Sequence, residues 1–181
     1  CAKRAELAAA ALVVGIVFML VLPMPVWLRD ILIACSLCAS GLIVVAKTDE
    51  IHEALSEQFR SREVYKSYIA LVHGATEQIF GKIAAPIGRN KHNRLRMKVA
   101  TSGRTALSLW RVRQRFDKFT LLDVEIKTGR THQIRVHMAY INHPIVGDEI
   151  YNEGRDNTIA DTNTRNAIRS LHRFFLHAER L

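Results

Sequence analysis

Two long apolar runs open the chain. Leu7–Leu22 contains no charged side chain, and a second run of similar length covers Ile31–Ala46. Pro23 and Pro25 lie between them and stop or kink a helix, because proline lacks the backbone donor. Each run is slightly shorter than the roughly 20 residues that a helix needs to cross a bilayer, and longer than a buried strand. The pattern fits either a membrane helix or helical hairpin, or one or two buried core helices of a soluble protein.

From residue 47 onward, short amphipathic patterns replace the apolar runs. Thr48–Arg62 carries an apolar residue at every fourth position from Ile51 to Phe59, which predicts a helix with one apolar face. We therefore expect a domain boundary near this point. Residues 1–46 would form an apolar helical segment, and residues 47–181 a separate domain.

Strand patterns follow this helix. Val64–Val72 is rich in Tyr, Ile and Val, which predicts a strand. Leu107–Phe116 and Phe119–Lys127 are separated by a short polar turn, which predicts a β-hairpin. Arg94–Val99 alternates basic and apolar residues strictly, which predicts a half-buried strand with a cationic outer face. Thr131–Ile141 is predicted to be a helix.

The remaining connections are rich in turn-forming residues. Pro144 and the pair Gly147-Asp148 predict a loop, and the polar segment Asn152–Asn166 predicts a mobile surface loop. Because the strands come in succession and the helices are isolated, this order favours an α+β fold over alternating βαβ units.

Charge is spread unevenly along the chain. The 181 residues carry a formal net charge of +9, and Lys82–Lys118 holds eleven basic residues against a single acid, Asp117. Such a balance favours an anionic partner, either nucleic acid or a lipid surface. A solvated surface face is the plainer alternative. The three cysteines are too few for a disulfide scaffold and suit a reducing compartment.

Motifs for several kinds of chemistry are missing from the sequence. There is no Gly-x-Ser-x-Gly nucleophile elbow, no Gly-x-x-x-x-Gly-Lys-Ser/Thr phosphate loop and no Gly-x-Gly-x-x-Gly fingerprint. Cys35 and Cys38 have no second pair, and His132 and His137 leave a helix on different faces, so neither pair predicts a metal site. What remains is a run of cationic and hydrogen-bonding residues, Gly129–His137.

That run belongs to a longer segment, KTGRTHQIRVHMAYINHPIVGDEIY, which resembles the RluA-type pseudouridine synthases. The segments LIVVAKTDEIHEALSEQFRSREVYKSYIALVHG, APIGRNKHNRLRMKV and LHAERL resemble the same family in the same order, over about residues 40–181. The resemblance implies a pseudouridine synthase fold, with a mixed, mostly antiparallel sheet flanked by helices. It implies isomerisation of uridine in structured ribosomal or transfer RNA, in the cytoplasm, by a monomer without metal or organic cofactor.

The same resemblance implies roles for individual residues. Arg135 is the arginine that pairs with the catalytic carboxylate, and Tyr68 is the tyrosine that stacks on the target base and is a candidate base at the ribose. Without the resemblance, Arg135 is a surface helix arginine and Tyr68 a core tyrosine of a strand. The residues expected to line the site or contact RNA are Arg89, Arg94, Arg96, Lys98, Arg130, His132 and Gln133.

The chain departs from the family at its central motif, Arg-Leu-Asp-x-x-Thr-Ser-Gly. Aligning Ser40-Gly41 places the family's catalytic aspartate at Ser36, whose neutral hydroxyl has no visible base to activate it. Arg135 would then lack its charge partner. We therefore predict that the chain, as it stands, has no synthase activity.

The apolar sequence at the start resembles a different family. Residues 5–40 are similar to the first membrane segments of the type III secretion export-gate family, through the Leu22–Pro25 break, Trp27 and Asp30. The abrupt change near Ser36 indicates a chimera of two reading frames, in which the synthase domain is truncated at both ends.

Three functions therefore remain open. The first is a pseudouridine synthase domain that is inactive in this copy, and the second is a non-catalytic RNA-binding module. The third is a membrane or secretion component whose identity lies in residues 1–40, with membrane contact through residues 7–46.

Overall fold

A computed structural model of the chain describes residues 44–181. They fall into two units, which are described separately: the described residues of the first are 44–57, and the main unit contains residues 58–181. Most of the predicted apolar segment, with Ser36 and the export-gate resemblance, lies outside the described residues. Within residues 44–181, no helix has the length and apolar character needed to cross a membrane.

The first described element is the predicted amphipathic helix. Helix α3 (Asp49–Ser61) begins after Thr48, whose hydroxyl accepts the backbone N–H of Ile51, and it carries acidic residues in its first turn. None of its residues is buried, and Ile51 and Phe59 on its apolar face are 47% and 42% exposed. The helix predicted over Thr48–Arg62 is confirmed by α3.

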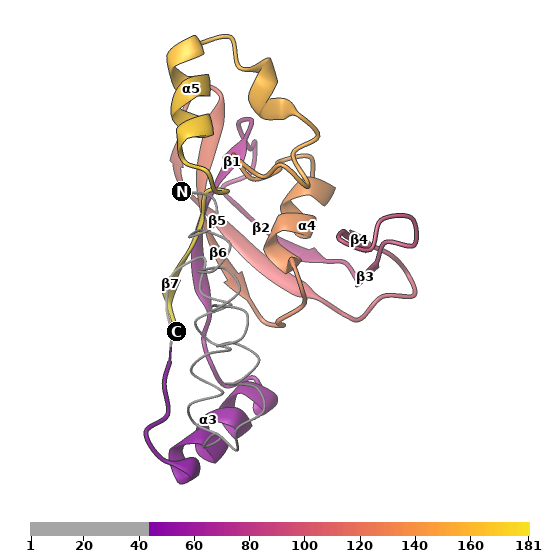
Figure 1. Cartoon of the computed structure of the whole chain (residues 1–181), viewed down its shortest axis with the longest axis vertical. Coiled ribbons are helices and arrows are strands. Elements are labelled where there is room, and N and C mark those ends of the chain that lie inside the picture. Colours follow the sequence, from indigo (N-terminus) through magenta and orange to yellow (C-terminus); the bar gives the residue numbers. More distant parts are fainter. Residues whose placement is uncertain (1–43) are drawn as a thin grey trace, which may run out of the picture. The chain divides into compact units, whose positions relative to one another are not determined.

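The main unit is built on a five-stranded antiparallel sheet (Figure 1). The predicted strand near Val64–Val72 is β1 (Ser67–His73). The predicted hairpin is β5 (Leu107–Arg115) and β6 (Phe119–Ile126), closed by Phe116 N–H donating to Phe119 O at 2.8 Å. The α+β class is confirmed. In spatial order the strands are β2 (Phe80–Ala84), β5 (Leu107–Arg115), β6 (Phe119–Ile126), β1 (Ser67–His73) and β7 (Leu176–Arg180).

A second, two-stranded sheet corrects one prediction. It pairs β3 (Ile87–Arg89) with β4 (Met97–Val99), so only the last half of the predicted strand Arg94–Val99 is extended. Asn93 forms a turn instead, because its side chain accepts the N–H of Leu95 and its carbonyl accepts the N–H of Arg96. Leu95, expected on the apolar face of the strand, is exposed at the tip of the connection.

Helix α4 (Gln133–Tyr140) lies between the two sheets (Figure 1) and confirms the helix predicted over Thr131–Ile141. Ile134 and Met138 join the core on the five-stranded sheet, and Val136 joins a second cluster that contains Ile87 of β3. The helix is therefore buried on more than one face, which fixes the orientation of every side chain in its centre.

The segment Asn152–Asn166, predicted to be a mobile surface loop, is instead built into the fold. It contains the short 3-10 helix η1 (Arg155–Thr158) and the start of helix α5 (Thr162–Ser170). The side chain of Asp161 accepts backbone N–H groups at the start of α5 and caps that helix. The polar composition therefore reflects helix capping and side-chain hydrogen bonding.

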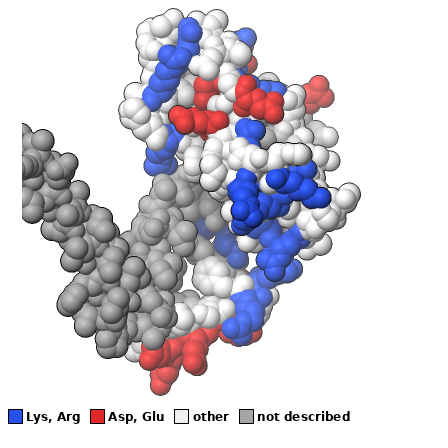
Figure 2. All heavy atoms as spheres, turned by 45° about the vertical axis from the view of Figure 1, so that its right-hand side comes forward, with Lys and Arg blue, Asp and Glu red and all other residues white. Residues whose placement is uncertain are grey.

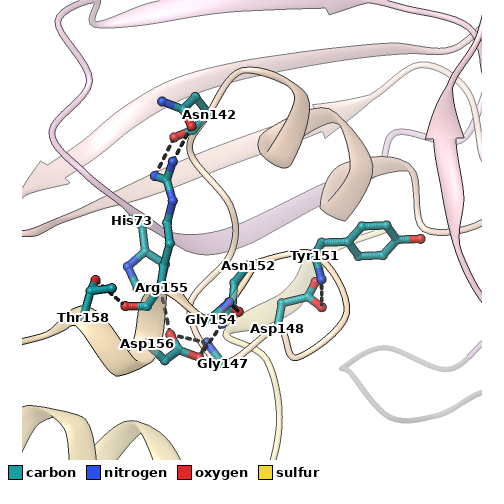
Figure 3. A network of polar contacts seen from close by, with 10 residues as sticks. All are labelled: His73, Asn142, Gly147, Asp148, Tyr151, Asn152, Gly154, Arg155, Asp156 and Thr158. Carbon is teal, nitrogen blue, oxygen red and sulfur yellow. Dashed lines mark hydrogen bonds and ion pairs between the residues drawn. The ribbon is translucent and has the colours of Figure 1, made fainter.

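Asp156 of η1 is the centre of a polar network that holds the neighbouring loop (Figure 3). Its carboxylate lies 2.8 Å from His73 Nε2 at the end of β1 and accepts the N–H of Gly147 at 3.2 Å. Asn152 donates to the same carboxylate. Gly147 stands directly before Asp148, so this network sets the backbone from which Asp148 projects.

Candidate functional site

Arg135 and Asp148 form a buried ion pair at the centre of the site. Arg135 lies on α4 and is 8% exposed, while Asp148 is 0% exposed. The guanidinium donates from Nε and Nη2 to the two carboxylate oxygens, each at 2.7 Å. Arg135 therefore has a charge partner, Asp148, that the sequence analysis did not predict. Its interpretation as a surface helix arginine is wrong.

The carboxylate of Asp148 accepts hydrogen bonds from the backbone as well as from Arg135. Oδ1 accepts the N–H groups of Ile150 and Tyr151, at 3.1 and 3.2 Å. Figure 3 shows the carboxylate turned toward the Tyr151 backbone. A carboxylate with this many donors and no exposure is a structural acid that orients Arg135.

Two aromatic rings complete the surroundings of Arg135. Its guanidinium carbon lies 4.4 Å from the centre of the Phe174 ring and 4.9 Å from that of Tyr151. Both distances are within the range of cation–π attraction, which strengthens when the cation is desolvated. The ion pair and the two ring contacts together hold the Arg135 guanidinium in place.

Tyr68 lies on the face of the sheet against which α4 packs. It shares that face of β1 with Ala70 and Val72 and packs on the core that Ile134 and Met138 of α4 complete. Burial raises the pKa of the Tyr68 phenol, so the hydroxyl stays protonated at neutral pH and can donate a hydrogen bond. Tyr68 and the helix of Arg135 thus adjoin one core.

Gln133 belongs to a buried hydrogen-bond network and does not face solvent. It is 3% exposed, and its amide nitrogen donates to Leu107 O and Ser108 Oγ, both at 3.0 Å. Its amide oxygen accepts from Thr128 Oγ1 and from the N–H of Arg130. The side chain therefore ties α4 to β5, and in this conformation it is not presented to RNA.

His137 extends the same network at the other end of α4. Its Nε2 lies 2.9 Å from Ala85 O, which can only accept, so Nε2 carries the proton and Nδ1 accepts from Ser108 Oγ at 2.9 Å. The side chain is 0% exposed, and burial lowers its pKa from the ordinary value of 6.5. The native domain therefore holds His137 neutral.

Acidification is expected to destabilise the domain through these histidines. As the pH is lowered through 6.5, His137 takes up a proton in the unfolded chain but stays neutral in the folded chain, because its pKa there is lower. The free energy of unfolding therefore decreases as the pH is lowered, until the folded-state pKa is passed. Burial shifts His73 and His132 in the same direction. Urea unfolding between pH 8 and 5 measures the slope. His137→Gln should flatten it, and the same change at exposed His92 should leave it as in the wild type; equal slopes in all three proteins would contradict this assignment.

Tyr151 joins the β3–β4 hairpin to the start of α4. Its hydroxyl accepts the N–H of Met97 at 2.8 Å and hydrogen-bonds His132 Nδ1 at 2.9 Å. His132 precedes α4 in the left-handed conformation, with φ 56°, and burial beside the Arg135 charge lowers its pKa. The ring of Tyr151 also lies 5.9 Å from the Arg96 guanidinium. One side chain therefore contacts three of the predicted site residues, Arg96, His132 and Arg135.

Sequence reasoning missed both Asp148 and Tyr151. Asp148 was predicted to be a loop residue because Gly-Asp is a turn signal, and nothing in the local pattern marks it as buried. The signal available was the apolar pair Ile145-Val146 just before it, which shows that this stretch of loop enters the core.

The predicted RNA-contacting residues gather around the β3–β4 hairpin. Arg89, Arg94 and Lys98 are exposed, and no carboxylate of the described residues pairs with them. Figure 2 shows Lys and Arg side chains massed on the face that carries this hairpin. Arg130, half-buried, donates from Nε to Thr105 O at 3.0 Å and lies beside the start of α4. Such a surface attracts a polyanion.

The described residues contain no cluster of three or more His, Cys, Asp or Glu side chains that could hold a metal ion. The cations, aromatic rings and hydrogen-bond donors described above can bind and position an anionic ligand.

Comparison with known families and proteins shows which proteins the chain is similar to. The model of the family described as RNA pseudouridylate synthase matches residues 37–140, more than half of the chain. The chain is 47% identical over 112 residues to "Uncharacterized RNA pseudouridine synthase YlyB" of Bacillus subtilis, covering 62% of this chain and 37% of that protein. It is 44% identical over 143 residues to "Ribosomal large subunit pseudouridine synthase D" of Xanthomonas campestris, covering 78% of this chain and 43% of the relative.

Among solved structures, the human protein "RNA Pseudouridylate Synthase Domain Containing 1" superposes with a TM-score of 0.61 at 28% identity, over 74% of this chain and 55% of the human chain. A second human structure, "RNA Pseudouridylate Synthase Domain Containing 4", has a TM-score of 0.58 at 20% identity and shares the fold. The chain spans about two fifths of the length of the curated relatives given above.

Proposed function

Because the chain belongs to the RNA pseudouridylate synthase family, we propose that its domain binds structured ribosomal RNA and holds a uridine beside Tyr68 and Arg135 without isomerising it. One observation carries the binding part of this proposal. The cationic β3–β4 hairpin is locked by Tyr151 onto the helix that carries Arg135, so the surface that attracts RNA and the predicted uridine site form one rigid assembly.

The chemistry explains why such an assembly is needed. Pseudouridine formation breaks the N1–C1′ bond of a uridine, turns the base and rejoins it to C1′ through C5. The base must first leave its stack, so the protein has to bind a distorted strand and receive the everted base. Phosphate contacts from exposed Arg and Lys side chains supply the binding, and an aromatic side chain such as Tyr68 stacks on the base.

The missing carboxylate is the reason for proposing that the chain does not turn over. The resemblance places the family's aspartate at Ser36, which lies just before the first residue of the family match and outside the described structure. Asp148 does not replace it, because it has no exposed surface and its oxygens are occupied by Arg135 and two backbone donors. A neutral serine hydroxyl without an adjacent base is a poor substitute for a carboxylate.

Two assays on the full chain test the proposal. Binding to a large-subunit ribosomal RNA transcript should be measurable and should weaken steeply with salt. Tritium release from the same transcript, labelled at uridine C5, should not exceed the rate without protein, while a full-length relative with the aspartate serves as the positive control. Release above background would contradict the proposed inactivity, and salt-independent or absent binding would contradict the RNA-binding function.

A further inference from the structure

The tip of the β3–β4 hairpin presents an isolated apolar side chain. Leu95 is 79% exposed, more than any other large hydrophobic residue among residues 44–181. It stands within a polar segment, Asn90–Arg96, whose other side chains are Asn, Lys, His and Arg. An exposed leucine is ordinary on its own. Two further features of the hairpin indicate which kind of partner this leucine contacts.

The first feature is that the hairpin tip is preorganised. The Asn90 side chain accepts the N–H of His92 at 2.9 Å, and the Asn93 side chain accepts the N–H of Leu95 at 3.0 Å. Asn90 N–H donates to Arg96 O at 3.0 Å and closes the loop. These Asx-type contacts hold the backbone of Leu95 in place without burying its side chain.

Contacts outside the tip also hold the hairpin in place. The loop that follows β4 returns against β3, where Ile87 and Arg104 form an isolated bridge with two backbone hydrogen bonds of 2.9 Å. Gly103 makes this approach possible, because a Cβ there would lie 2.5 Å from the carbonyl carbon of Ile87. Together with the Tyr151 contact to Met97, this fixes the direction in which the tip projects.

The second feature is the charge around the leucine. Arg94 is its exposed neighbour, Arg96 follows it, and the sequence from Gln78 to Phe116 contains no acidic residue. A protein-binding patch would need further apolar surface beside Leu95 and fewer Lys and Arg side chains. A single apolar side chain surrounded by cations matches the requirements of a nucleic acid, with its anionic backbone and apolar base faces.

We propose that Leu95 is a wedge that inserts between stacked bases of the RNA beside the target nucleotide, while Arg94 and its basic neighbours hold the flanking phosphates. The proposal rests on the RNA-binding function proposed above and adds a residue that opens the stack. Everting a nucleotide costs unstacking free energy, and an apolar side chain that fills the opened step offsets that cost.

Leu95→Ala in the full chain tests the wedge on a large-subunit ribosomal RNA transcript. We expect the affinity to fall about tenfold, as for loss of one stacking contact, with no change in the slope of log affinity against log salt. Dimethyl sulfate probing should show bases made reactive by the wild type and protected again with the variant. Leu95→Met should restore both properties, and Leu171→Ala, at another exposed leucine, should resemble the wild type.

The outcomes separate the wedge from the function on which it rests. If the wild type binds with a salt-dependent affinity but Leu95→Ala keeps the affinity and the base reactivities, the wedge is overturned and RNA binding stands. A lowered salt slope in Leu95→Ala would also overturn the wedge, because it would indicate a lost phosphate contact. If the wild type does not bind the transcript, both proposals fail. Since Leu95 is exposed, its removal costs no core contact, and an unchanged urea midpoint would verify this.

Discussion

Replacement of Asp148 by asparagine is expected to lower the free energy of unfolding by about 3–5 kcal/mol, the range for breaking a buried ion pair by removing one partner. The mutation leaves the guanidinium of Arg135, a residue that is 8% exposed, without its counter-charge. It also weakens the acceptor for the N–H groups of Ile150 and Tyr151. Urea denaturation of the full chain, followed by circular dichroism, measures the change.

Asp117→Asn provides a matched control. Asp117 also pairs with a cation, Lys118 at 3.7 Å, but its side chain is 89% exposed, so removing its charge should change stability by less than about 1 kcal/mol. A loss in Asp148→Asn no larger than in Asp117→Asn would show that the carboxylate is not needed to hold Arg135. Because small domains are stable by only about 5–15 kcal/mol, the expected loss is a large share of the total.

The sheet was predictable from sequence wherever one face is buried. In β1, the enrichment in Tyr, Ile and Val predicted the strand, and in β6 buried and half-buried positions alternate because alternate side chains face the core. The polar Asp117-Lys118 pair marks the turn between β5 and β6. The alternation in Arg94–Val99 predicted a longer strand than the structure contains, for a physical reason. Local side-chain acceptors on Asn93 competed with extended pairing, and only Met97–Val99 found a partner strand.

The candidate site was predictable only in part. Arg135, Tyr68 and the basic residues came from a resemblance and from charge, both of which are visible along the chain. Asp148 was not predictable in this way, because its importance comes from a partner thirteen positions away and from burial by loop backbone. The β2 and β7 strands were missed since each is short, with a single buried residue, and is extended mainly through its pairing with a central strand.

Neutralising the exposed cations of the hairpin is the second large effect. The triple variant Arg89→Gln, Arg94→Gln and Lys98→Gln should bind a large-subunit ribosomal RNA transcript about a hundredfold more weakly at 0.1 M salt. The estimate follows from counterion release, where each phosphate contact contributes about 0.7–0.9 to the slope of log affinity against log salt. The slope should therefore fall by about 2–3. Folding should be unaffected, because all three side chains are exposed.

A charge-matched control decides whether position or net charge governs the binding. Lys118→Gln, Arg173→Gln and Arg180→Gln together remove three exposed cations from outside the hairpin, so both triple variants have the same net charge. If the hairpin face binds the phosphates, the control should lose only the small affinity due to long-range attraction and should keep most of the wild-type salt slope. Equal losses in both variants would mean that the basic chain attracts RNA diffusely. The hairpin, with Leu95 at its tip, would then have no privileged contact with the nucleic acid.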